Sequence, residues 1–189
     1  MSKAIYLLRH CAIPENELGI NGSRTDSSLS ENGNRAAIEL IPLLSSHNYD
    51  LIIVSPLKRT IQSIQPYLDS LINPPKVEIE PLTVERDLGV FTNTKAGGPI
   101  PEDIKKQGIG SVRWQPENGE STVQVGERAE KFLLKLRQRP ETSILICGHQ
   151  NFLRCLELLI NQKPIDDEHY MSDNPPRLNN NEIRKIDLN

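Results

Sequence analysis

Three short apolar runs, at residues 4–8, 51–54 and 143–147, constrain the fold of this chain more than any other feature of its sequence. A run of this length bounded by polar residues is typical of a strand that is covered on both faces, as in the centre of a parallel sheet. Residues 77–80 and 183–188 mix apolar and polar positions more evenly, which is typical of edge strands. The sequence therefore predicts a sheet with a parallel centre and two less buried edges.

Amphipathic helical patterns lie between these runs. Apolar residues recur every three or four positions after Ser30, after residues 55–56, after Ser121 and after His149, so each stripe would pack on a face of the sheet. Strands that alternate with helices predict an α/β fold with three layers. Pro42 and Pro66 lie inside two of the helical patterns, and we expect a kink or a break at each, because proline lacks the backbone donor.

Length and charge limit the class of protein. With 189 residues and no shift in composition, the whole chain from 1 to 189 is predicted to form one domain. The net charge of −3 is spread along the chain, so nucleic acid is not an expected partner. No apolar signal segment or run of about 20 residues is present, so we expect no membrane association and a cytoplasmic location.

Three cysteines, at positions 11, 147 and 155, lack the C-x-x-C spacing of a zinc site. Their odd number fits a reducing compartment better than a disulfide scaffold, so free thiols are expected. The sequence also shows no cluster of Asp and Glu of the kind that holds magnesium. We therefore expect no metal site.

The segment at about 91–119 is rich in Gly and Pro and interrupts every periodic pattern. It is predicted to be an insertion with at most a short helix around 102–107, either a lid over a functional site or a surface excursion without a role. Its cations are candidate contacts to the non-reacting part of an anionic substrate. They are Lys95, Lys105, Lys106 and Arg113.

Histidine and arginine follow the predicted central strands. Arg9 and His10 end the first run, while His149 and Arg154 follow the last one. Ligands of open α/β sheets bind beyond the carboxyl ends of the strands, so both histidines are expected to face one crevice. Imidazole can attack phosphorus and guanidinium can bind a phosphoryl group through paired hydrogen bonds. This combination indicates phosphoryl transfer through a phosphohistidine.

A third cation is predicted beside this crevice. Ser55 follows the second run and is expected to cap a helix, with Pro56 as its first residue. Arg59 would then lie in the first turn of that helix, at an end that favours an anion.

The ordered set of motifs resembles the histidine phosphatase superfamily, also called the phosphoglycerate mutase-like family, and its phosphatase branch in particular. The motifs are Arg9-His10, Asn16, Arg24-Thr25-Asp26, Ser55-Pro56-x-x-Arg59, Glu85-x-x-x-Gly89, Gly119-Glu120-Ser121 and Gly148-His149-x-Asn151-x-x-Arg154.

The resemblance implies a three-layer α/β/α sandwich around a mainly parallel mixed sheet and a metal-independent phosphomonoesterase without a cofactor. It implies that His10 is the nucleophile and Glu85 the proton donor, and that His149 is a further catalytic residue. The implied phosphate contacts are Arg9, Asn16, Arg59, His149 and Gln150.

Three positions depart from the family pattern. Cys11 stands where glycine usually follows the nucleophile, residues 91–93 replace a Trp-Glu-Gly sequence, and Gln150 stands where glycine is common. Glycine tolerates a positive φ and a close backbone approach, whereas the Cβ of Cys11 must be accommodated. The substrate, expected to be a small phosphorylated metabolite, and the oligomeric state are left open by the sequence.

Several alternatives stay open at this stage. A mutase-type phosphoryl transferase and a non-catalytic phosphate-binding protein would keep the same crevice. Cys147 and Arg154 suggest a thiol phosphatase, but they are separated by six residues where that signature has five. Cys11 beside a cationic pocket could be a redox sensor if its thiol ionises easily, or simply a small buried residue.

Overall fold

The protein, seen here in a computed structural model, is described over residues 2–98 and 100–189, so Met1 and Pro99, the latter in the predicted insertion, lie outside the described residues. Within that part of the chain five strands form one sheet in the order β3-β2-β4-β1-β5. The strands are β1 (Lys3–Arg9), β2 (Leu51–Val54), β3 (Lys76–Ile79), β4 (Ser143–Gly148) and β5 (Ile183–Leu188).

The sheet is parallel at its centre, as the apolar runs predict. Strand β4 pairs in parallel with β1 and β2, and β2 pairs in parallel with β3. The last strand, β5, pairs antiparallel with β1, which makes the sheet mixed. Strands β3 and β5 are the edges, in agreement with their mixed pattern of apolar and polar residues.

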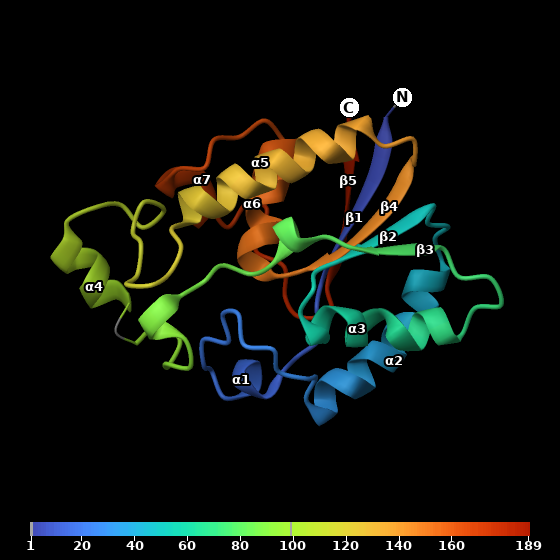
Figure 1. The fold of residues 1–189 in the computed structure, drawn as a ribbon, viewed down its shortest axis with the longest axis horizontal. Helices are drawn as coiled ribbons and strands as arrows, with labels where there is room; N and C mark the ends of the chain where they lie inside the picture. The colour runs from blue at the N-terminus through green and yellow to red at the C-terminus, as the bar shows by residue number, and fades with distance from the viewer. Residues whose placement is uncertain (1, 99) are drawn as a thin grey trace.

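Helices cover both faces of the sheet and give it three layers (Figure 1). Helices α2 (Glu31–Ser45) and α3 (Lys58–Asp69) pack on one face, and α5 (Thr122–Gln138) and α6 (Gln150–Ile160) pack on the other. Successive residues of a strand point to opposite sides of the sheet. The side chains of the central strands therefore contribute to two separate apolar clusters, one on each face. The predicted α/β/α sandwich is therefore confirmed.

The shorter elements lie near the carboxyl ends of the central strands or in the insertion. They are α1 (Pro14–Glu17), α4 (Ile100–Gln107), α7 (Asp167–Met171) and the two 3₁₀ turns η1 (Pro81–Thr83) and η2 (Gly89–Phe91). Helix α4 confirms the short helix predicted within 91–119, and it projects beyond the sandwich (Figure 1). No helix in the described part of the chain is long and apolar enough to cross a membrane.

The helix starts were predicted with mixed success. Ser30 and Ser121 cap α2 and α5 as expected, each through a side-chain oxygen that accepts from a backbone N–H in the first turn. The predicted cap at Ser55 and the helical start at Pro56 are wrong, because α3 begins at Lys58. The backbone N–H of Lys58 instead donates to Asp26 Oδ1 at 2.8 Å, so a carboxylate distant in sequence satisfies this helix end.

The two internal prolines do not break their helices. Pro42 lies in the last turn of α2 and Pro66 in the last turn of α3, and both helices continue beyond them. A proline in the last turn removes only one intrahelical hydrogen bond. Because only three residues of each helix follow it, the loss does not break the helix.

Candidate active site

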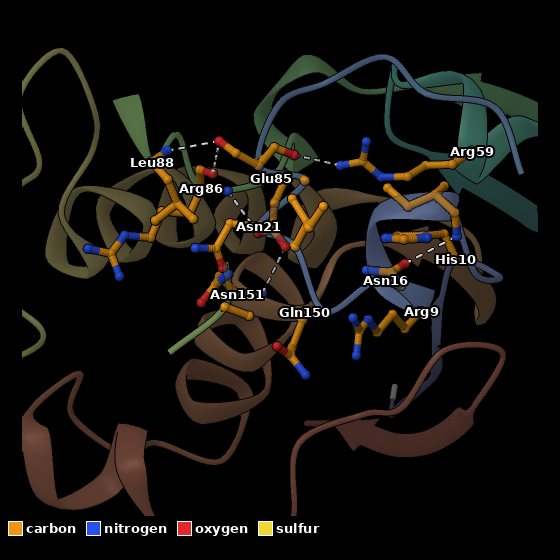
Figure 2. A pocket seen from close by; sticks show the side chains of 16 residues that line it. Arg9, His10, Asn16, Asn21, Arg59, Glu85, Arg86, Leu88, Gln150 and Asn151 are labelled. Atoms are coloured by element: carbon orange, nitrogen blue, oxygen red, sulfur yellow. Dashed lines mark hydrogen bonds between the residues drawn. The ribbon is translucent and has the colours of Figure 1, made fainter. Parts of the chain in front are cut away.

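Residues from the carboxyl ends of the central strands line one polar cavity of about 200 Å³. Arg9 ends β1 and His10 follows it, while Gln150 begins α6 directly after β4. Parallel neighbours end at the same edge of a sheet, which brings these sequence-distant residues together. Figure 2 shows Arg9, His10 and Asn16 on one side of the cavity and Arg86 and Asn151 on the other.

His10 is held as a neutral imidazole with one nitrogen free. Its Nδ1 lies 2.7 Å from the carbonyl oxygen of Cys11, so Nδ1 donates and Nε2 keeps its lone pair. Burial, followed by the charge of Arg59, lowers the pKa of His10 well below its usual value of 6.5. The ring is therefore unprotonated at neutral pH, as a nucleophile must be.

Arg59 places a buried positive charge against this cavity. Its Nη2 donates to the Ser23 carbonyl at 2.8 Å, its Nη1 donates to the Thr25 carbonyl, and its Nε donates to His149 Nδ1 at 3.2 Å. These bonds use three of the five guanidinium N–H donors, so two are left for an anion. Arg59 thus lies in the first turn of α3, as expected, although the helix starts later than the sequence suggests.

The Arg9 guanidinium also has N–H donors without a protein partner in the described part of the chain. Its Nη1 donates to the Leu178 carbonyl at 3.0 Å, and its buried Nε has no hydrogen-bond partner among the described residues. Burial lowers the pKa of Arg9 below its usual value, with the nearby Glu85 carboxylate acting in the opposite direction. An unsatisfied buried N–H of a cation is a group that an incoming phosphate can satisfy.

Glu85 supplies a carboxylate to the same cavity. It is 8% exposed, its Oε1 accepts from the Arg86 backbone N–H at 2.7 Å, and its Oε2 lies 3.4 Å from the Asn151 N–H at the start of α6. The side chain is fixed by these backbone donors, and it lines the cavity together with His10. A positioned carboxyl group within reach of a bound phosphate ester can act as acid and base.

His149 lies beside His10 but does not line the cavity. The two ring centroids are 5.2 Å apart, and His149 is fully buried. Its Nδ1 accepts from Arg59, so Nε2 must carry the proton, which it donates to Ser55 Oγ at 2.7 Å. A direct contact from His149 to phosphate stays a prediction, because both ring nitrogens already have protein partners here.

Arg154, singled out in the sequence with His149, does not belong to the site. It is buried and lies more than a full turn inside α6, where its guanidinium donates to the carbonyls of Pro175, His169 and Ser172 at 2.8–2.9 Å. This arginine fixes the segment after α7 to α6. The expectation that it shares the phosphate crevice is wrong, because the helical rotation turns its side chain towards α7.

The cysteine alternatives lose their support. All three thiols are free and buried, as expected of the cysteines. Burial raises the pKa of Cys11 to about 11 and that of Cys147 well above its usual value, so neither ionises easily. The backbone φ of Cys11 is not positive, so this position does not require glycine. A side chain is therefore accommodated beside His10. Cys11 is a small core residue here.

Further polar side chains line the cavity, some of them predicted from the sequence and some not. Asn16 Oδ1 accepts from the Ile13 N–H at 3.2 Å, and the Gln150 amide lies 3.4 Å from the Leu178 carbonyl; both side chains line the cavity. Asn21 and Arg86 also line the cavity, although no periodic pattern or motif in the sequence indicates them. No group of three or more His, Cys, Asp or Glu that could hold a metal ion occurs in residues 2–98 and 100–189.

Residues 5–183 match the model of the histidine phosphatase superfamily, branch 1. Phosphoserine phosphatase 1 of Hydrogenobacter thermophilus is 28% identical over 160 residues, which cover 80% of this chain and 73% of that protein. Adenosylcobalamin/alpha-ribazole phosphatase of Escherichia coli is 26% identical over 156 residues, covering 80% and 76%. A putative alpha-ribazole-5'-P phosphatase structure from Escherichia coli superposes with a TM-score of 0.83 at 22% identity, over 99% of this chain and 91% of that one.

The chain therefore belongs to the histidine phosphatase superfamily, in agreement with the resemblance of its motifs, and it is a phosphatase of that superfamily.

Two buried neutral histidines make the stability of the fold sensitive to pH. The pKa values of His10 and His149 lie well below 6.5 in the folded state, mainly because both rings are buried. The unfolded chain therefore binds more protons, and the stability present above about pH 6.5 is lost as the pH falls towards the folded pKa values. We expect the melting temperature to fall between pH 6.5 and 5 in phosphate-free buffer.

The slope of this fall in melting temperature with pH distinguishes the contribution of the histidines from that of the carboxylates. In His149→Asn we expect a shallower fall over the same interval, because one buried imidazole is gone. An unchanged slope in this variant, or a flat profile in the wild type, would show that the two rings are not buried as neutral groups.

Proposed function

We propose that this protein hydrolyses a small phosphorylated metabolite through a covalent phosphohistidine at His10. The observation that carries the proposal is the unshared Nε2 of His10 in a cavity that Arg9, Arg59 and Glu85 also line. A nucleophile, two guanidinium groups and a carboxyl group are the parts that phosphoryl transfer to and from a histidine requires.

The reaction proceeds in two displacements. His10 Nε2 forms a bond to phosphorus as the ester P–O bond breaks, and the protonated Glu85 gives its proton to the departing alkoxide. Water then attacks the phosphohistidine, Glu85 takes a proton from it, and the P–N bond breaks to release phosphate and restore His10. Arg9 and Arg59 balance the charge on the phosphoryl oxygens in both steps, and Asn16 and Gln150 complete the phosphate contacts.

His149 holds the Arg59 side chain in place and does not line the cavity itself. Its neutral ring accepts a hydrogen bond from Arg59 and adds no charge beside His10, because its proton stays on Nε2 towards Ser55. A protonated ring at that place would repel both Arg59 and a protonated His10. We assign His149 the role of a positioning residue, with a direct contact to phosphate to be tested by substitution.

The relatives act on different phosphorylated compounds and do not single out a substrate for this protein. One is a phosphoserine phosphatase and another an adenosylcobalamin/alpha-ribazole phosphatase, so the leaving groups of relatives range widely in size. A cytoplasmic location and the lid role of residues 91–119 stay predictions.

A panel of phosphomonoesters tests the proposal. We expect release of inorganic phosphate from at least one alkyl phosphate and from 4-nitrophenyl phosphate, unchanged by EDTA and blocked by vanadate, which mimics the phosphoryl group. Phosphoryl transfer within a phosphoacid without release of phosphate would indicate a mutase. Binding of phosphate without any turnover would indicate a non-catalytic protein, and activity lost in EDTA and restored by magnesium would contradict the metal-free reaction.

A further inference from the structure

A second cavity, of about 480 Å³, opens beside the phosphate cavity. Five residues line both cavities, so the two cavities adjoin. These residues are Asn21, Arg86, Leu88, Gln150 and Asn151. A leaving group that is bonded to a phosphoryl group at His10 would have room in this second cavity, which we call the leaving-group compartment.

Apolar side chains form much of the wall of the leaving-group compartment. Ile100 and Ile104 come from α4, Trp114 from the end of the insertion, and Met171 from the end of α7. Trp114 is itself 1% exposed and donates its indole N–H to Asp103 at 2.7 Å, which fixes α4 against the body of the protein. The compartment thus offers an apolar surface to the body of a leaving group.

The same compartment is positively charged. Arg86 and Arg177 line it, and none of the described lining residues is acidic. Arg86 is held by the carbonyls of Glu120 and Trp114 at 2.8 and 3.0 Å.

Arg177 lies over the Tyr170 ring at 4.7 Å and forms no ion pair within the described part of the chain. Its Nη2 makes only two long contacts, at 3.5 Å, to the Tyr170 carbonyl and Met171 Sδ. Arg177 is half-buried, so water does not fully solvate its charge. A half-buried guanidinium without a carboxylate beside it favours a bound anion.

The four cations that the sequence suggested for substrate contact are exposed and line neither cavity. They are Lys95, Lys105, Lys106 and Arg113.

We propose that Arg177 selects phosphomonoesters whose leaving group carries a second anionic group, a carboxylate or a phosphate, on a body with an apolar face. This inference rests on the proposed hydrolysis and deepens it. The apolar body lies against Ile100 and Ile104 of α4, and the anion pairs with Arg177, which has no competing carboxylate in the compartment.

Matched aryl phosphates test this selection. 4-Carboxyphenyl phosphate and 1,4-phenylene bisphosphate each carry a second anion, whereas 4-carbamoylphenyl phosphate has the same shape without the charge. In the wild type we expect kcat/KM to favour at least one anionic substrate over the carboxamide by about 10–100-fold, the range expected of a charged hydrogen bond. The favoured substrate distinguishes a carboxylate from a phosphate.

Substitution of the cation should remove the preference alone. In Arg177→Met, which keeps an apolar side chain over Tyr170, we expect the anionic preference to vanish while turnover of 4-nitrophenyl phosphate and inhibition by inorganic phosphate stay within about threefold. Arg177→Lys should keep part of the preference. Lys106→Met, on the exposed side of α4, is the matched control and should change nothing.

The outcomes separate the selection from the proposed function. No anionic preference in an active wild type overturns the role of Arg177, and so does an equal loss of all substrates in folded Arg177→Met, which would place this arginine on the transferring phosphoryl group. Absence of 4-nitrophenyl phosphate turnover in the wild type overturns the proposed function itself.

Discussion

His10→Ala is expected to abolish turnover of every phosphomonoester, with a fall in kcat of at least about 10³-fold, because the proposed covalent intermediate forms on its imidazole. His10 is the imidazole that lines the cavity with a free Nε2. Brief incubation with a labelled substrate should give an acid-labile, base-stable adduct in the wild type and none in the variant. Quenched-flow labelling and steady-state release of phosphate measure the two quantities.

Two controls make this result specific. His47→Gln changes a histidine that packs on Tyr6, away from the cavity, and should leave both labelling and turnover intact. Cys147→Ser tests the thiol mechanism. A label that persists in His10→Ala but disappears in Cys147→Ser would move the nucleophile to the thiol, against its full burial and its raised pKa.

Glu85→Gln is expected to slow hydrolysis of alkyl phosphates by about 10²–10⁴-fold, the usual contribution of a general acid. Hydrolysis of 4-nitrophenyl phosphate should fall by less than about tenfold, because nitrophenolate leaves without a proton. Glutamine keeps the size of the side chain, so inhibition by inorganic phosphate should be nearly unchanged. The ratio of the two rates in the variant and the wild type is the measurement.

Asp87 is the matched control for this acid. Its carboxylate lies two residues further along, accepts from the Gly89 N–H at 2.9 Å and pairs with Arg24 at 3.6 Å, and it does not line the cavity. Asp87→Asn should therefore spare the leaving-group dependence. If Glu85→Gln slows both substrates equally, or neither, Glu85 is not the acid, and a leaving-group effect in Asp87→Asn would identify its replacement.

Much of the site could be predicted because its residues follow strands. An apolar run shows where a buried strand ends, and the parallel arrangement brings the ends of β1, β2 and β4 to one edge of the sheet. Arg9 and His10 follow directly from this rule. Glu85 was placed by the resemblance to the family and not by any period in the sequence.

The predictions from the sequence are wrong where a side chain turns away from the end of its strand. Arg154 follows the same strand as His149, yet it lies far enough along α6 to face the segment after α7. Ser55 matches the pattern of a helix cap, but its hydroxyl pairs with His149, and Asp26 from another part of the chain takes over the helix end. Local patterns do not reveal which distant partner competes for a polar group.

The sequence by itself determined the layered fold and the carboxyl-end crevice that Arg9 and His10 line, because both depend on hydrophobic periodicity and on the order of strands. Only the tertiary structure decided that Nε2 of His10 is free while both ring nitrogens of His149 have protein partners, since this depends on single contacts such as those to Cys11 and Arg59. It also decided the leaving-group compartment, whose walls come from α4, α7 and the segment around Arg177. Irregular segments lack a period, so the meeting of their side chains is fixed by long-range packing alone.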